Sequence, residues 1–276
     1  MRQIGQTRTL LLLVLPGLLF IFIFFAIPLI FVLGESVVGD GGRLSFAGYT
    51  NFFADHNAMR IYWRTLRLGM IVTLIAILLG YPASYLLSRM PSGRRTFFMS
   101  LVILPLMTNP IARTYAWLII LGRSGLINKV LLGLGLVQEP PRLIFTEGAI
   151  IVGLVQLFLP LMVLSLVSAL ENIPEEVVEA AQSLGAGGFT TFLRVIMPLS
   201  ADGLVLGGTL VFTGAITAYV TPAILGGTRV LVLATLLQQR AMVAMDWTGA
   251  TVVAVVMLAT ALIVNMGLRR FRPEVV

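Results

Sequence analysis

The sequence predicts an all-α protein that crosses a membrane six times. Its 276 residues are 58% hydrophobic and only 11% charged, whereas soluble domains carry roughly 25% charged residues. A helix needs ~20 apolar residues to cross a hydrocarbon core of ~30 Å, and a segment in lipid must satisfy its own backbone hydrogen bonds. Six segments meet this condition: Leu10–Leu33, Leu68–Leu87, Phe97–Leu121, Ala149–Leu170, Gly203–Leu225 and Ala250–Leu268.

The first apolar segment follows Arg2 and Arg8, as a signal peptide would. It is longer than a signal core of ~7–15 residues and lacks a small-x-small cleavage site. We therefore expect an uncleaved first span, and six spans put both termini on one side. The arginine and lysine totals of the two sides are equal, but Arg94-Arg95 and Arg269-Arg270 are dense clusters in short segments, which carry most of the orientation signal. Both termini are therefore expected in the cytoplasm.

Composition excludes several kinds of function. The net charge of +7 comes mainly from arginines at the ends of the spans, which is typical of membrane proteins, so nucleic-acid binding is not expected. There is no cysteine, and the one histidine, His56, lies in a polar loop, so no metal site is expected. No carboxylate falls in the middle of a span, which argues against ion-coupled transport. The single lysine, Lys129, is not part of a phosphate-binding loop, so any ATP must be hydrolysed by another subunit and no cofactor is expected.

The inner loop between the fourth and fifth spans contains helix start and stop signals that predict two short helices. Pro174 suits the first position of a helix, and Glu175 and Glu176 in the first turn complement the helix dipole. Gly185 is the residue type favoured where a helix ends in a left-handed conformation. A second short helix is expected from Thr190 or Thr191 to Met197.

One face of the first short helix is apolar, through Val177, Ala180, Ala181 and Leu184 at i, i+3, i+4, i+7 spacing. This face fits two hypotheses. The helix either packs on the membrane bundle as an ordinary surface helix, or it docks a soluble partner. Periodicity alone does not separate them.

The same loop resembles the EAA loop of binding-protein-dependent ABC transporter permeases. Glu179-Ala180-Ala181 is followed after three residues by Gly185 and, after nine further residues, by Val195-Ile196-Met197-Pro198. Methionine at 197 departs mildly from the leucine of the family pattern. The resemblance assigns coupling to an ATPase to Glu179, Ala180, Ala181, Gly185, Ala186, Val195 and Pro198.

The resemblance implies the type I ABC importer permease fold. It divides the chain into an N-terminal helix with the first periplasmic loop (1–60), a transmembrane core (61–268) and a basic cytoplasmic tail (269–276). It also implies a non-catalytic subunit in the bacterial inner membrane. The expected partners are a second permease subunit, as a heterodimer, a cytoplasmic ATPase dimer, a periplasmic solute-binding protein and the lipid bilayer.

Weaker stretches resemble the spermidine/putrescine branch, including Gly80-Tyr81-Pro82 and Thr221-Pro222. They suggest a polyamine or a similar small polar solute. Arg113 lies in the third span after two prolines. It either snorkels to the outer surface, or it lines the pathway or bonds carbonyls that the prolines free. The candidate pathway residues are Arg113, Tyr115, Trp117, Tyr219 and Thr221.

Two alternatives of other classes remain at this point. An ion-coupled secondary transporter or channel would need a functional carboxylate within a span. A membrane scaffold without a transport role would need none of the coupling features. Co-purification of an ATPase separates an importer subunit from both.

Overall fold

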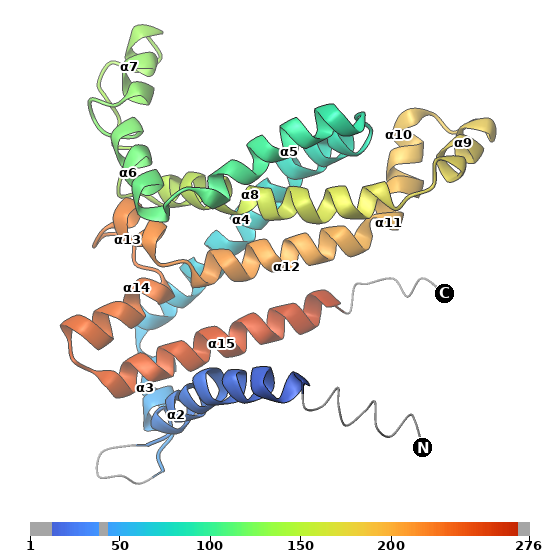
Figure 1. The fold of residues 1–276 in the computed structure, drawn as a ribbon. Helices are drawn as coiled ribbons and strands as arrows, with labels where there is room; N and C mark the ends of the chain where they lie inside the picture. The colour runs from blue at the N-terminus through green and yellow to red at the C-terminus, as the bar shows by residue number, and fades with distance from the viewer. Residues whose placement is uncertain (1–12, 39–43, 270–276) are drawn as a thin grey trace, which may run out of the picture. The chain divides into compact units, whose positions relative to one another are not determined.

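The structure is a computed structural model, and it describes residues 13–38 and 44–269. The chain divides into two compact units (Figure 1). One contains residues up to 59 together with 237–256, and the other contains residues 60–236 and the chain from 257 onward. Within the described residues the regular structure is helical, apart from an isolated bridge between Val38 and Leu44.

Four helices are long and apolar enough to cross a membrane alone. They are the helix Leu13–Glu35, which contains η1 (Phe22–Ala26) and α2 (Ile27–Glu35), and then α4 (His56–Ser88), α8 (Glu147–Glu171) and α15 (Trp247–Arg269). Leu10, at the start of the first expected span, lies outside the described residues. The other three predicted spans fall within these helices.

The third predicted span is broken within its length, and the fifth predicted span is preceded by a bend. α5 (Ser92–Met107) and α6 (Pro110–Ile120) meet at 94°, and the helix Gly188–Leu199 meets α12 (Ala201–Thr217) at 68°. The number of spans is six when each bent pair counts as one.

Local backbone chemistry explains these breaks. Thr108 and Asn109 are extended, and the Asn109 side chain accepts hydrogen bonds from the first free amides of α6 at 2.8 and 3.3 Å. The expected fifth span ends early because Ala218 is extended, and α13 (Val220–Gly226) follows as a separate helix.

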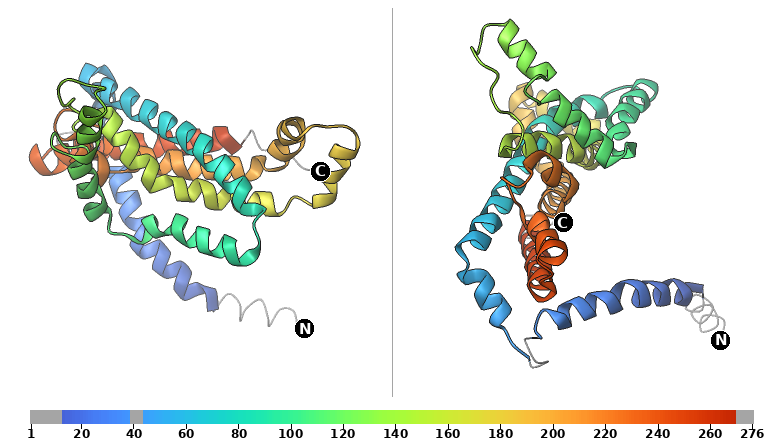
Figure 2. Two further views of the ribbon diagram at one scale, coloured as in Figure 1. Left: turned by 90° about the horizontal axis from the view of Figure 1, so that it is seen from above. Right: turned by 90° about the vertical axis from the view of Figure 1, so that its left-hand side faces the viewer.

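The core of the larger unit is the contact between α8 and α12, which lie side by side (Figures 1 and 2). Gly203 and Gly207 make this contact close. A Cβ added at Gly203 would lie 2.7 Å from the Ser165 carbonyl oxygen, and one at Gly207 would lie 2.8 Å from the Met162 sulfur. These two glycines, four residues apart, form a small-xxx-small pair that packs the two helices.

The long helix α4 begins much earlier than its apolar stretch. The residues between the first two predicted spans are not all loop, because His56–Arg67 is already helical and α3 (Ala47–Ala54) precedes it. Farther along α4, Ser84 is buried and donates to the Val163 carbonyl of α8 at 3.3 Å. The remaining short helices are α7 (Leu126–Gly133), α14 (Leu233–Gln238) and η3 (Gln239–Val243).

The smaller unit is held by contacts around α3. Phe52 is buried, and the Ser36 hydroxyl lies 2.7 Å from that of Tyr49. Arg240 of η3 pairs with Asp55 at 3.9 Å. These contacts join the chain after the first span to η3.

Candidate functional site: an exposed coupling loop

The inner loop forms α9 (Glu175–Ser183), close to the predicted first helix. Pro174 has an extended backbone with ψ of 139° and lies just before the helix, so it occupies the capping position and not the first helical one as expected. Glu175 and Glu176 lie in the first turn as predicted. Their charges stabilise the free amides at this end of the helix.

Gly185 ends α9 in the left-handed region, with φ of +87°. Its amide donates to the Gln182 carbonyl at 2.9 Å, and the next amide, of Ala186, donates to the Ala181 carbonyl at 3.1 Å. These two bonds are the Schellman motif, which satisfies the last carbonyls of a helix. The predicted role of Gly185 as a helix terminator is confirmed.

α9 is exposed along its whole length, with no buried residue. Leu184 is 89% exposed and Phe189, just after the turn, is 76% exposed. Figure 1 shows α9 and α10 beyond the ends of α8 and α12. Within the described chain the apolar face is therefore mostly open, although Ala181 is half-buried and α9 contacts α10 and η2. This disfavours the ordinary surface-helix hypothesis and leaves a face suited to a soluble partner.

The second helix of the loop is longer than predicted and runs from Gly188 to Leu199. It comprises α10 (Gly188–Thr191), the π-turn η2 (Phe192–Ile196) and α11 (Met197–Leu199). Thr191 and Ile196 are buried, whereas Pro198 is exposed and Val195 is half-buried. The aliphatic end of the motif therefore anchors the loop mainly through Ile196.

Aromatic contacts connect the loop to the C-terminal end of α4. The Tyr81 hydroxyl hydrogen-bonds to Ser200, and the Phe192 ring lies edge-on to Tyr81 and Tyr85 at 5.2 and 5.9 Å between ring centroids. Phe192 and Ser200 were not among the predicted site residues. Tyr81 and Tyr85, one helical turn apart, were the available signal, because this spacing puts them on one face.

Charged contacts add a second tie at the same end of α4. Arg89 lies over the Tyr85 ring at 5.8 Å and reaches Glu175 of α9 at 3.5 Å. Arg95 of α5 pairs with Glu171, the last residue of α8, at 2.6 Å. Exposed ion pairs of this kind contribute ~0–1 kcal/mol each, so they orient the loop more than they stabilise it.

The third predicted span contains a buried polar contact. Arg113 of α6 donates from Nη1 to the Pro105 carbonyl of α5, across the bend. Its other terminal nitrogen, Nη2, is buried without a hydrogen bond to the residues that the structure describes. The structure therefore favours the hypothesis that Arg113 bonds a carbonyl that the helix break frees, and not that it snorkels outward.

The other candidate pathway residues divide into two groups. Trp117 donates to the Gln156 amide oxygen of α8 at 2.6 Å, and buried Thr221 lies 3.4 Å from the Thr114 hydroxyl. These side chains bind their own chain. Tyr115 and Tyr219 are exposed, so they are the candidates left with rings open to a solute or a second subunit.

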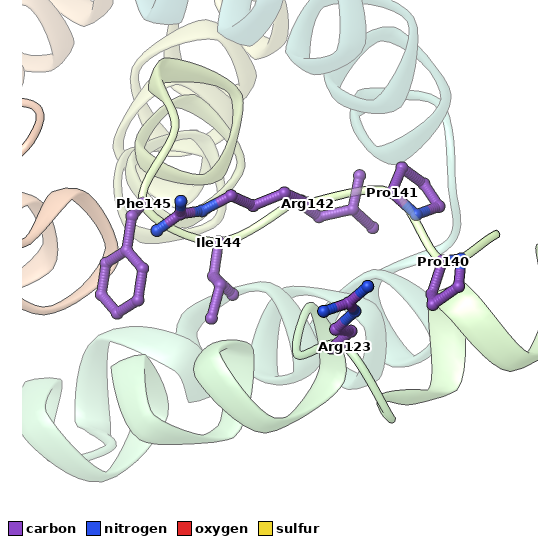
Figure 3. Close-up of a pocket in the computed structure, with 7 residues that line it drawn as sticks. Arg123, Pro140, Pro141, Arg142, Ile144 and Phe145 are labelled. Carbon is purple, nitrogen blue, oxygen red and sulfur yellow. The ribbon is translucent and has the colours of Figure 1, made fainter.

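A cavity of about 380 Å³ lies at the end of this unit away from the coupling loop. Figure 3 shows Arg123 and Arg142 entering it from different segments, together with Pro140 and Phe145. No carboxylate lines it. Buried Asn128 holds the surrounding turn by donating to the Gly122 and Pro141 carbonyls at 3.0 and 3.2 Å.

The helical bundle and its exposed loop are typical of the membrane subunit of an importer. The chain belongs to the family described as "Binding-protein-dependent transport system inner membrane component", which it matches over residues 73–275. It is an inner-membrane, multi-pass and non-catalytic permease subunit, and ATP hydrolysis lies in a partner. Permeases of this family act with a second permease, an ATPase and a binding protein.

Two relatives are similar over most of the chain. The "Spermidine/putrescine transport system permease protein PotB" of Haemophilus influenzae is 34% identical over 238 residues, covering 84% of this chain and 83% of that protein. PotB of Escherichia coli K12 is 32% identical over 237 residues, covering 84% and 85%.

A solved structure has the same fold at low identity. The chain matches a "bacterial alginate ABC transporter in complex with alginate pentasaccharide-bound periplasmic protein" with a TM-score of 0.82 at 16% identity, covering 98% and 97% of the two chains. The type I importer permease fold is therefore confirmed, and the ion-coupled alternative is not favoured.

Proposed function

We propose that this chain is one half of a heterodimeric permease that imports a polyamine of the spermidine and putrescine class. The observation that carries the proposal is the similarity to two PotB proteins over more than four fifths of the chain. The proposed divisions are 1–60, 61–268 and 269–276. ATPase coupling is proposed for the seven loop residues Glu179, Ala180, Ala181, Gly185, Ala186, Val195 and Pro198.

The charges at the end of the larger unit away from α9 support selection of the solute by the binding protein and not by this subunit. Arg123 and Arg142 line the cavity there without a carboxylate, and a polycation is repelled by such a site. The same arginines suit an acidic docking surface on a solute-binding protein, because complementary charge steers association. Tyr115 and Tyr219 are proposed to contact solute by their exposed rings, which suit a cation passing with weak attraction.

Uptake measurements test the substrate. A strain that lacks this gene and every other polyamine importer should lose accumulation of labelled putrescine and spermidine, and the cloned gene should restore it. Molybdate uptake is the control, because the "Molybdenum transport system permease protein ModB" of Azotobacter vinelandii is 30% identical over 163 residues. Normal polyamine uptake in the deletion strain would remove this substrate.

The proposed orientation places both termini and the loop around α9 in the cytoplasm. It rests on the arginine clusters in short segments, including Arg94 and Arg95. A reporter fused after Val276 should be active only in its cytoplasmic form. Activity of a periplasmic reporter there would reverse the orientation and remove α9 from reach of an ATPase.

A further inference from the structure

The first turns of α4 carry arginines at a defined depth. The apolar stretch of this helix begins at Leu68, and a helix rises ~1.5 Å per residue. Arg67, Arg64 and Arg60 therefore lie roughly 1.5, 6 and 12 Å beyond the edge of the hydrocarbon. The headgroup layer is ~5–8 Å thick on each side of a bilayer. Arg67 and Arg64 thus lie at the depth of lipid phosphates, and Arg60 lies just above it.

These arginines share one face with an exposed tryptophan. Arg60, Trp63, Arg64 and Arg67 follow i, i+3, i+4, i+7 spacing and line a cavity of about 250 Å³ together with Glu147. We call these five residues the α4 headgroup cluster. Because its members come from one helix face and the start of α8, they converge on one small space.

The charge of the α4 headgroup cluster is not balanced. Glu147 accepts from Arg64 Nε at 3.2 Å and from Arg67, so two guanidinium groups share one carboxylate. Arg64 also donates to the Leu231 carbonyl at 3.2 Å, which fixes its plane. No ion pair is recorded for Arg60 with any described residue. Three arginines and one glutamate leave an excess of two positive charges, held in position before any ligand arrives.

Trp63 makes a membrane ligand more suitable than a soluble one. Its side chain is 62% exposed, roughly 7.5 Å beyond Leu68 on the same helix. The Tyr62 ring packs edge-on against it at 5.6 Å, and the Tyr62 hydroxyl lies 3.3 Å from that of Thr260. Tryptophan prefers this depth because its ring is apolar and its N–H group is polar.

We propose that the α4 headgroup cluster binds the phosphate of an anionic phospholipid. Arg60 and Arg67 contact the phosphate oxygens, Arg64 holds Glu147 in place, and Trp63 packs on the glycerol and upper acyl chain. Guanidinium groups match phosphate geometry through paired N–H donors. The inference is independent of the transported solute; under the proposed orientation the lipid lies in the outer leaflet.

Native mass spectrometry of the purified permease–ATPase complex tests the proposal. The probes are phosphatidylglycerol and phosphatidylcholine of identical chains, supplied in equal amounts, and the readout is the ratio of the two lipids bound. Each arginine near a membrane surface is worth about fivefold in binding of anionic lipid. Arg60→Gln and Arg67→Gln should each lower the ratio by about fivefold, and Arg60→Lys by less.

The matched control is Lys129→Gln on α7, which removes one exposed charge outside the cluster and should leave the ratio unchanged. Arg60→Gln breaks no recorded ion pair, so it remains informative if Arg67→Gln inserts poorly. Adding excess inorganic phosphate distinguishes a lipid phosphate from a free phosphate ion as the ligand. We expect phosphatidylglycerol to stay bound. Displacement by inorganic phosphate would indicate an anion site and overturn the lipid assignment. An unchanged ratio of bound lipids in Arg60→Gln would also overturn it. So would an Arg60→Gln variant that binds the solute-binding protein more weakly but keeps the wild-type lipid ratio.

Discussion

Replacing Gly185 tests whether the conformation of the inner loop controls coupling. Gly185 has φ of +87°, and a Cβ added there would meet no heavy atom within 4 Å. Space is therefore available, and the cost is conformational. A non-glycine residue in the left-handed region costs ~1–2 kcal/mol, and a β-branched one is a stronger outlier. Relieving that strain breaks the two hydrogen bonds of the turn, at ~1 kcal/mol each.

Either route costs ~1–2 kcal/mol, which lowers the ratio of ordered to disordered loop about 5- to 30-fold. α9 has only nine residues and no buried side chain, so little else holds it. Gly185→Val should therefore insert normally but lower ATPase co-purification and solute uptake, by at most this factor.

A substitution series separates the causes. Gly185→Ala should be nearly as harmful as valine if conformation dominates, whereas a much larger effect of valine would indicate a clash with the docked ATPase. Gly185→Asn should be milder, because asparagine tolerates the left-handed region. Gly188→Ala is the control, since Gly188 lies at the start of α10 without a positive φ. Normal uptake by both Gly185→Ala and Gly185→Val at normal expression would refute the reasoning.

Three further changes probe other parts of the argument. Glu179→Lys should weaken ATPase co-purification while leaving insertion unchanged, and undiminished binding would show that this charge does not face the partner. Arg113→Gln should lower the thermal unfolding midpoint, because the Pro105 carbonyl loses its charged donor and keeps only the Thr108 hydroxyl at 2.8 Å, at a cost of ~1 kcal/mol; an unchanged midpoint would contradict this role. Gly207→Leu should reduce the yield of folded protein, because its side chain would overlap Met162, whereas wild-type yield would mean that α8 and α12 separate easily.

Much of the fold follows from local chemistry in the sequence. The four long helices coincide with long apolar segments, because lipid forces such segments to satisfy their backbone internally. Gly185 at the end of α9 was predictable for a similar reason: a helix that stops needs its last carbonyls bonded, and glycine permits that turn. The family followed from four spaced elements of the inner loop.

Only the tertiary structure decided which alternatives hold. Periodicity cannot show whether an apolar face is covered, and the exposure of Val177, Ala180 and Leu184 shows that most of this face is open within the described residues. Hydropathy cannot show the break between α5 and α6, because both halves are apolar and the bend depends on a few residues around Asn109. Arg113 bonds the Pro105 carbonyl across a bend. Phe192 contacts α4, which is distant from it in sequence. Such contacts depend on how helices pack, which local sequence chemistry does not specify.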